Sequence, residues 1–301
     1  MADERVDDPA REPLGRVMRD VAAADSDPAR LVAAVEKSAR IYRTPSGEGE
    51  MVWRAWGDGA PLLLLHGGSG SWTHWIRTIP TLARTYELWV PDLPGLGDSA
   101  MPPRPWTPAS VAEVVTGGLL RLLPREASLR IAGFSFGGHV AGLAAARLAA
   151  SVRALVLVGV AALGVKADPR RPFLKVRGGM AEDEIAAVFR QNLEVLMFAD
   201  PSNIDALAVY LQAENVRRAR FRSRPFAATD GLARALEGVS APLKTIWGTR
   251  DIVARPSLEV RLELLRRHHP ELEVRLIEGA GHWVAYEAAE RFNAALQDVL
   301  A

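Results

Sequence analysis

The chain contains no cysteine among its 301 residues. Disulfides, thiolate metal sites and cysteine nucleophiles are therefore all excluded. An excess of one charge sign is missing too, because 37 Lys and Arg residues balance 36 Asp and Glu residues to a formal net charge of +1. Without an overall basic field, nucleic acid is not expected as a partner.

Long hydrophobic runs are also absent. No uncharged apolar run approaches the roughly 18 to 20 residues that a membrane-spanning helix needs, so we expect no membrane span. Residues 1–27 mix acidic and basic side chains and lack the apolar segment of a secretory signal, which favours a cytoplasmic location. With 49% hydrophobic and 24% charged residues, the composition is that of an ordinary soluble globular protein.

Short apolar runs alternate with helical segments along most of the chain. Continuous apolar strands that alternate with helices indicate a parallel sheet with both faces covered. Asp27 and Pro28 look like an N-cap and a first helical residue. The strands are expected at 39–44, 51–56, 62–65, 87–90, 128–132, 154–158, 243–247 and 272–277. The helices are expected at 29–37, 72–85, 108–123, 138–150, 182–197, 204–216 and 285–300.

The alternation is interrupted over residues 163–241, which contain several helical segments and no convincing strand. A helical insertion between two sheet strands would lie over the carboxyl ends of the strands, where ligands bind in open α/β sheets. We therefore expect a helical cap at 163–241, a core formed by 27–162 and 242–301, and a polar N-terminal arm at 1–26.

The most informative motif is GFSFG at residues 133–137, which follows an apolar run. A strand that turns sharply into a helix at Ser135 would expose the serine hydroxyl, and the flanking glycines would let the backbone pass closely. The N-terminal N–H groups of the following helix would favour a developing negative charge there. The motif therefore predicts a nucleophilic serine.

An acid and a histidine follow two later predicted strands. Asp251 comes after the apolar run 243–247 and His282 after the run 272–277, which completes the chain order Ser, Asp, His. This predicts acyl transfer in which Ser135 attacks, His282 acts as general base and then acid, and Asp251 fixes the imidazole tautomer. The expected oxyanion donors are the backbone N–H groups of Phe136 and, in the HGGSG loop at 66–70, Gly68.

Several further residues are candidates for the surroundings of the site. Asp92 and Asp98 are interpreted as loop-bracing residues because the intervening sequence is rich in proline and glycine. The arginine-rich segment 217–224 is either a solvated face of the cap or the source of an arginine for a substrate carboxylate. His66 is interpreted as a bracing residue and His139 as a packing residue on the helix after Ser135. The candidates for the substrate pocket are Ser69, His74, Phe134 and Trp283.

Taken together, these motifs resemble the α/β-hydrolase fold family from about residue 41 to residue 300. The resemblance rests on HGG at 66–68, DLPGLGDS at 92–99, GFSFGG at 133–138, GTRD at 248–251 and GHW at 281–283. It implies an eight-stranded, mostly parallel sheet covered by helices on both faces, an inserted helical cap, and a triad that needs no cofactor and no metal. The family does not fix the substrate.

The leading functional hypothesis is a serine hydrolase that cleaves a small or medium carboxylic ester. HGGSGSW at 66–72 and HWVAYE at 282–287 also resemble carbon–carbon hydrolases of aromatic ring-fission products. A cofactor-free haloperoxidase or perhydrolase, and a ligand-binding protein on a hydrolase scaffold, stay open as alternatives. A serine nucleophile argues against an epoxide hydrolase or a haloalkane dehalogenase. The expected partner is a small-molecule substrate, and the oligomeric state, a homodimer included, stays open.

Overall fold

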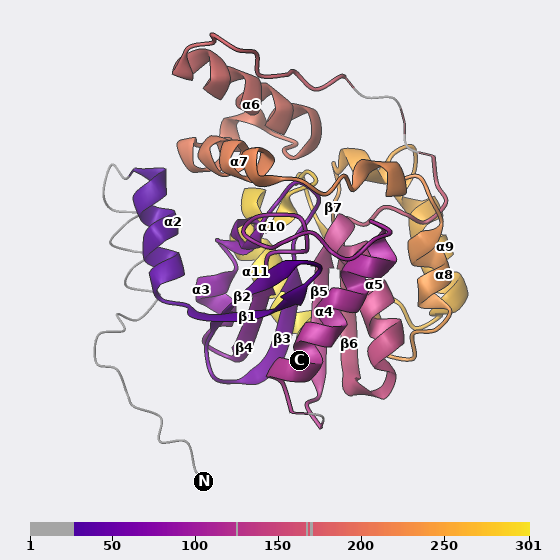
Figure 1. Ribbon diagram of the computed structural model, residues 1–301. Coiled ribbons are helices and arrows are strands. Elements are labelled where there is room, and N and C mark those ends of the chain that lie inside the picture. The colour runs from indigo at the N-terminus through magenta and orange to yellow at the C-terminus, as the bar shows by residue number, and fades with distance from the viewer. Residues whose placement is uncertain (1–26, 125, 167, 169–170) are drawn as a thin grey trace.

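An eight-stranded sheet forms the centre of the protein (Figure 1). The structure, a computed structural model, describes residues 27–124, 126–166, 168 and 171–301, so the arm expected at 1–26 lies outside the described residues. The strand order is β1-β2-β4-β3-β5-β6-β7-β8. The strands are β1 (Arg40–Ser46), β2 (Gly49–Trp56), β3 (Ala60–Leu65), β4 (Tyr86–Pro91), β5 (Leu129–Phe134), β6 (Val152–Val158), β7 (Leu243–Gly248) and β8 (Glu273–Ile277).

Only the first part of this sheet is antiparallel. Strand β2 pairs antiparallel with both β1 and β4, whereas every other pair of neighbours from β4 to β8 is parallel. The carboxyl ends of the parallel strands therefore meet at one edge of the sheet, as the sequence predicts. The eight-stranded, mostly parallel sheet is confirmed.

Helices cover both faces of the sheet. The helices are α2 (Pro28–Lys37), α3 (Ile79–Leu82), α4 (Pro108–Leu122), α5 (Phe136–Leu148), α6 (Glu182–Leu196), α7 (Ala206–Arg218), α8 (Gly231–Leu236), α9 (Leu258–His268), α10 (Val284–Glu287) and α11 (Ala289–Leu300). Short 3₁₀ helices occur at η1 (Trp72–Trp75), η2 (Ala149–Ser151), η3 (Pro201–Asn203), η4 (Arg224–Phe226) and η5 (Ile252–Ala254).

The two faces divide the core in two. Side chains alternate along a strand, so Leu63 and Leu65 pack with helices α4, α5, α8 and α9, whereas Leu62 and Leu64 pack with α2, α3 and α11. All four leucines are fully buried. A strand that is buried on both sides must be apolar throughout, which explains the LLLL run at 62–65.

Two predicted helices are wrong as continuous elements. The helix expected at 72–85 is divided into η1 and α3, and Pro80 lies in the first turn of α3, where its missing N–H group is tolerated but cannot continue the hydrogen bonds of a preceding helix. The helix expected at 285–300 is divided into α10 and α11 at Ala288, whose φ of −128° and ψ of 46° are not helical. The cap of α2 is confirmed, because Asp27 Oδ1 accepts a hydrogen bond of 2.9 Å from the N–H of Ala29.

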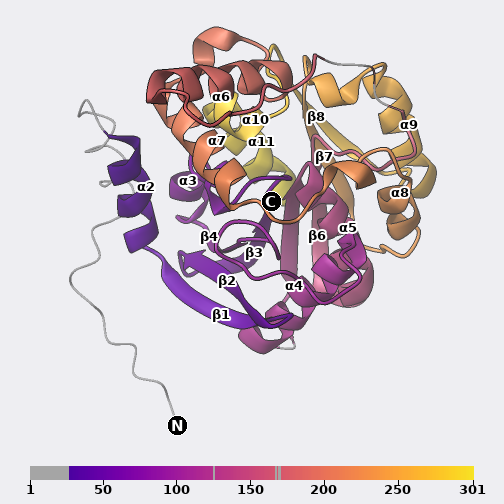
Figure 2. The same cartoon turned by 45° about the horizontal axis from the view of Figure 1, so that its top comes forward.

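The described part of residues 163–241 contains helices α6, α7 and α8 and no strand. Helices α6 and α7 pack against each other and lie together at the top of the view, above the sheet (Figures 1 and 2). Helix α8 instead packs against α5, with Leu232 and Leu236 buried in the same core as α4 and α5. The segment between β6 and β7 therefore has a raised part, α6 and α7, and a part that is integrated into the body.

Candidate active site

Ser135 lies at the sharp turn between β5 and α5. Its φ of 51° and ψ of −116° are strained for a residue with a side chain. The flanking glycines are necessary because a side chain at either position would clash with the backbone. A Cβ added to Gly133 would lie 2.5 Å from Gly137 O, and a Cβ added to Gly137 would lie 2.3 Å from Leu65 O. Ser135 itself is only half-buried, so the turn leaves it partly accessible.

The structure brings together the three residues predicted to form the triad. His282 Nε2 lies 3.0 Å from Ser135 Oγ, and His282 Nδ1 lies 2.9 Å from Asp251 Oδ2. Because an ionised carboxylate only accepts, the Nδ1–H group donates to Asp251 and leaves Nε2 free to accept from the serine hydroxyl. Asp251 and His282 are both 3% exposed, so water hardly competes for this pair.

Gly159, at the end of β6, gives the acid and the histidine their space. Its φ is +55°, and an added Cβ would lie 2.9 Å from Asp251 Oδ2 and 3.2 Å from His282 Nδ1. Any side chain here would press on the hydrogen bond between them. Gly159 was not among the residues predicted from the sequence, although a glycine directly after the apolar strand was a visible signal.

The loop that carries Asp251 is braced by a buried arginine. Arg261 on α9 is 1% exposed, and its guanidinium donates to Ala254 O at 3.3 Å and to Arg255 O at 3.1 Å. Burial lowers the pKa of Arg261, and the nearby Asp251 carboxylate opposes this effect. Arg261 was not singled out from the sequence, because an arginine in an amphipathic helix usually faces solvent.

The loop that carries His282 is held by Glu287 on α10. Glu287 accepts backbone hydrogen bonds from Gly281 at 2.6 Å, from Asp200 at 2.8 Å and from Ala199 at 3.0 Å. The N–H of Trp283 also donates to Met197 O at 2.8 Å. The histidine loop is therefore fastened to the segment that follows α6. This connection was not predicted from the sequence either.

His74 braces the loop in which an oxyanion donor is predicted. Its Nδ1 accepts a hydrogen bond of 3.2 Å from the N–H of Gly67, and its ring leaves no room for a Cβ at Gly70. Burial lowers the pKa of His74 well below its ordinary value, with further contributions from the neighbouring imidazoles of His66 and His282. His74 is therefore neutral and supports this loop as an acceptor.

The two predicted oxyanion residues lie next to each other. A Cβ added to Gly68 would lie 3.6 Å from the Cβ of Phe136, so the loop after β3 meets the residue after Ser135. Ser69, in the same loop, has a φ of 50° and is half-buried. The arrangement brings the loop after β3 against the residue that follows Ser135.

Phe134 and Trp283 lie behind the triad. Phe134 is 2% exposed, with its ring centre 4.9 Å from that of His282 and 5.5 Å from that of His74. Trp283 is 1% exposed, and its indole N–H donates to His74 O at 2.9 Å. These side chains fix the histidines from within the core.

The residues interpreted as bracing have that role in the structure. Asp92 accepts hydrogen bonds from the N–H of Trp72 at 2.8 Å and from the guanidinium of Arg54 at 3.0 Å. The N–H of Leu93 donates to His66 Nε2 at 2.8 Å. His139 is buried on α5, as expected of a packing residue.

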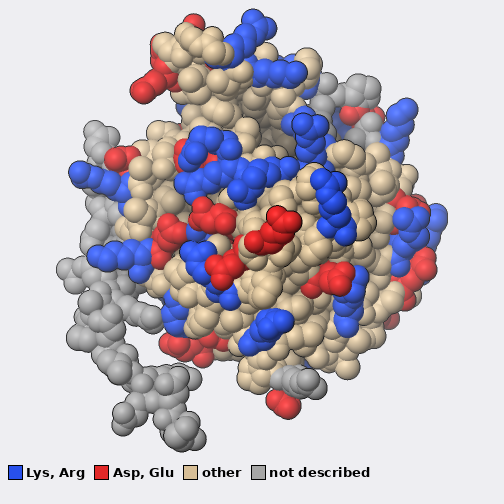
Figure 3. Space-filling model, viewed as in Figure 1, with Lys and Arg blue, Asp and Glu red and all other residues tan. Residues whose placement is uncertain are grey.

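Basic side chains gather along the end of α7 and the connection that follows it (Figure 3). Arg217 pairs with Glu214 at 2.8 Å, and Arg218 pairs with Asp98 at 2.9 Å. The guanidinium of Arg220 donates to Ser99 O, and that of Arg224 lies 4.1 Å from the ring centre of Phe173. Arg218 and Arg220 thus fasten the connection to the body, whereas Arg217 and Arg224 contact residues of the inserted segment itself.

Neither a metal-binding cluster nor a membrane-spanning helix is found among the described residues. Within these ranges, no three His, Asp or Glu side chains are grouped so that they could hold a metal ion. Nor does this part of the chain form any helix with the length and apolar character needed to cross a bilayer.

A nucleophile elbow on a mostly parallel sheet, with a hydrogen-bonded Ser, His and Asp, is the arrangement of an α/β hydrolase. Residues 62–295 match the model of the "Alpha/beta hydrolase family", and the chain belongs to that family.

Relatives of the chain include a 2-hydroxymuconate semialdehyde hydrolase of Pseudomonas sp. (strain CF600), 30% identical over 81% of this chain and 88% of the relative. A dihydrolipoyllysine-residue acetyltransferase component of the acetoin cleaving system of Pseudomonas putida is 31% identical over 78% of this chain. The match spans 62% of that relative's length. A solved bacterial membrane phospholipase A superposes with a TM-score of 0.72 at 26% identity, over 95% of each chain.

Proposed function

We propose that the protein is a serine hydrolase that cleaves a small or medium carboxylic ester through an acyl-enzyme on Ser135. The observation that carries the proposal is the unbroken chain of hydrogen bonds from Ser135 Oγ through both nitrogens of His282 to Asp251. A serine hydroxyl is a weak nucleophile unless an oriented base accepts its proton, and this chain supplies such a base.

The proposed reaction follows from the roles of these atoms. Ser135 Oγ attacks the carbonyl carbon while its proton passes to His282 Nε2, and Asp251 stabilises the imidazolium through Nδ1. The tetrahedral intermediate then collapses as the imidazolium protonates the leaving alcohol, which leaves the acyl group on Ser135. Water, activated by the same nitrogen, releases the acid and restores the serine.

The negative oxygen of the intermediate needs donors that are already in place. We assign this role to the backbone N–H groups of Gly68 and Phe136, which belong to the two segments that meet beside Ser135. The N-terminus of α5 adds the positive end of its dipole. Removing one such donor typically costs about 100- to 1,000-fold in kcat.

Residues 163–241 act as the cap of this site in the proposal. Two contacts support this role: the segment after α6 binds the histidine loop through Glu287, and the connection after α7 reaches Gly68. Both contacts lie at the carboxyl ends of the strands, where a ligand enters. Substrate selection then depends on how α6 and α7 lie over the nucleophile.

The test is the hydrolysis of a p-nitrophenyl ester series by the wild type and by Ser135→Ala. The variant should keep the melting temperature and lose nearly all turnover, by about 10⁶-fold for the loss of a triad nucleophile. Ser128→Ala is a matched control, because Ser128 is exposed at the opposite end of β5. Turnover by Ser135→Ala at the wild-type rate would overturn the mechanism.

Carbon–carbon bond hydrolysis is the second candidate. It is favoured by the similarity to a 2-hydroxymuconate semialdehyde hydrolase and by the exposed Arg222 and Arg224, which flank the residue that touches Gly68. An arginine can bind a carboxylate with two parallel hydrogen bonds. A ring-fission dienoate assayed beside the ester series decides between the two: faster turnover of the dienoate would favour carbon–carbon cleavage.

A further inference from the structure

The connection between α7 and η4 is clamped onto the body of the protein beside the nucleophile. The backbone N–H groups of Arg220 and Phe221 both donate to Gly95 O at 2.9 Å. Phe221 is 3% exposed and stacks on Phe136, the residue after the nucleophile, with ring centres 5.4 Å apart. These contacts fix the position of the residues that follow Phe221.

Ser223 is the residue that this clamp brings to the site. A Cβ added to Gly68 would lie 2.1 Å from Ser223 Oγ and 3.2 Å from Ser223 Cβ. The hydroxyl therefore contacts the α-carbon of Gly68, whose N–H is a proposed oxyanion donor. A Cβ at the same point would also lie 3.6 Å from the Cβ of Phe136, which carries the other donor. The serine hydroxyl, Gly68 and Phe136 thus converge on one place.

The Ser223 hydroxyl is free to bind a ligand. It does not cap η4, and within the described ranges the structure gives it no hydrogen-bond partner. Ser223 is half-buried, so it is not sealed inside the core. A hydroxyl is a rotatable donor that can follow an oxygen as its charge develops.

We infer that Ser223 is a third hydrogen-bond donor to the substrate carbonyl oxygen, supplied by the connection between α7 and η4. The inference rests on the proposed function, because it needs a carbonyl that Ser135 attacks. No covalent bond to Ser223 forms and its proton is not transferred. The O–H group donates to the carbonyl oxygen, and this hydrogen bond strengthens as that oxygen becomes negative in the tetrahedral intermediate. Substrate turnover then depends on the position of the connection as well as on the triad.

The decisive variant is Ser223→Ala, assayed on the ester that the wild type turns over fastest. We expect kcat to fall by roughly 10- to 100-fold while KM changes by less than about threefold, because the hydrogen bond strengthens mainly in the transition state. The affinity for a trifluoromethyl ketone, which forms a tetrahedral adduct with the serine, should fall by the same factor as kcat/KM. Ser240→Ala is the control, since Ser240 is exposed on the connection before β7.

The outcomes separate this inference from the proposed function. If Ser135→Ala loses turnover while Ser223→Ala keeps the wild-type rate within twofold, the role of Ser223 alone is overturned. A change confined to KM, with the ketone affinity preserved, would also overturn the role of Ser223, because a residue that only shapes the site would have this effect. Turnover that persists in Ser135→Ala would overturn the proposed function itself. If Ser223→Ala is unstable, Ser223→Cys keeps the size of the side chain with a weaker donor and should show the same loss of kcat.

Discussion

At the scale of single residues, the chemistry depends on which nitrogen of His282 carries the proton. The hydrogen bond of 2.9 Å to Asp251 places that proton on Nδ1 and directs the lone pair of Nε2 at Ser135. Gly159 keeps this pair free of any side chain. In the proposed mechanism Asp251 therefore sets the tautomer of His282, and a substitution that keeps the size of the side chain can test this role.

Asp251→Asn keeps the shape of the acid and changes the tautomer that it selects. An amide that donates to Nδ1 leaves the proton on Nε2, where it faces Ser135 and blocks general-base catalysis. Ester turnover should fall by about 10,000-fold in kcat with little change in melting temperature. Steady-state kinetics and thermal unfolding check this, and a kcat within tenfold of the wild type would assign the acid role to another residue.

Residue types with a local signature could be predicted from the sequence. Ser135, Asp251 and His282 each follow a predicted strand, and the rule that parallel strands end at one edge brings them together. Arg261 and Glu287 could not be predicted, because each acts on backbone groups whose approach depends on the packing of α9 or α10. Such contacts leave no spacing pattern in the chain.

At the scale of elements, the short helix α10 holds the loop of His282 in place against the rest of the fold. Helix α10 supplies Glu287, which accepts from the backbone of Gly281, next to His282, and from the segment after α6. One carboxylate thus fixes both the histidine loop and the base of α6. Loss of this connection should disturb stability and activity together.

Glu287→Gln tests that connection. The amide offers one acceptor oxygen in place of two charged ones, and hydrogen bonds to charged groups contribute about 1.5 to 3 kcal/mol each. The free energy of unfolding in urea should fall by about 1 to 3 kcal/mol, and kcat should fall as His282 loses its fixed position. Glu290→Gln, at an exposed site on α11, should match the wild type in both measurements. Unchanged stability and kcat in Glu287→Gln would contradict the anchoring role.

The sequence predicted the type of the long elements better than their continuity. Apolar strands such as 62–65 must lie in the interior of the sheet, because both of their sides must be covered. The interruption at Ala288 arises from a backbone conformation that no local residue type requires. The integration of α8 against α5 was equally hidden, since Leu232 and Leu236 are apolar in either arrangement.

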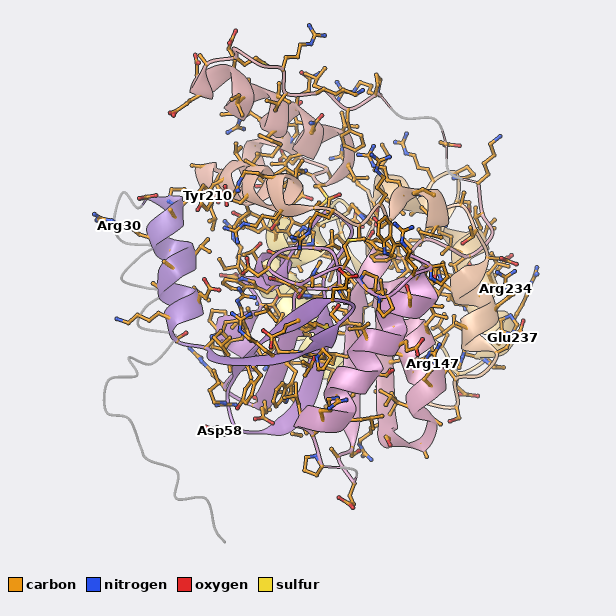
Figure 4. The ribbon with its side chains drawn as sticks, in the orientation of Figure 1. Arg30, Asp58, Arg147, Tyr210, Arg234 and Glu237 are labelled. Carbon is orange, nitrogen blue, oxygen red and sulfur yellow. The ribbon has the colours of Figure 1, made fainter. Side chains whose placement is uncertain are left out.

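At the scale of the whole molecule, buried histidines make stability depend on pH. His139 on α5 is 4% exposed and lies so close to α8 that a Cβ at Gly231 would be 2.6 Å from its Nε2. Burial first, and then the charge of Arg234, labelled on α8 in Figure 4, together lower the pKa of His139 to about 4. Burial also lowers the pKa values of His66 and His74.

The sign follows from the two states of His139. Below the ordinary pKa of about 6.5, His139 is protonated in the unfolded chain, whereas in the folded protein it stays neutral until about pH 4. The contribution of the neutral His139 to the free energy of unfolding is therefore present above pH 6.5. It is lost as the pH falls to about 4, to a limit of about 3 kcal/mol. His139→Gln should remove this part of the pH dependence, seen in urea unfolding between pH 4.5 and pH 8. A slope equal to that of the wild type would show that His139 is not held neutral.

The central claim is that Ser135 is an activated nucleophile, and covalent labelling with a fluorophosphonate tests it most directly. Intact-protein mass spectrometry should show one adduct per chain in the wild type, mapped by peptide analysis to Ser135, and no adduct in Ser135→Ala. A wild-type chain that stays unlabelled, or a Ser135→Ala chain labelled to the same extent, would contradict the account.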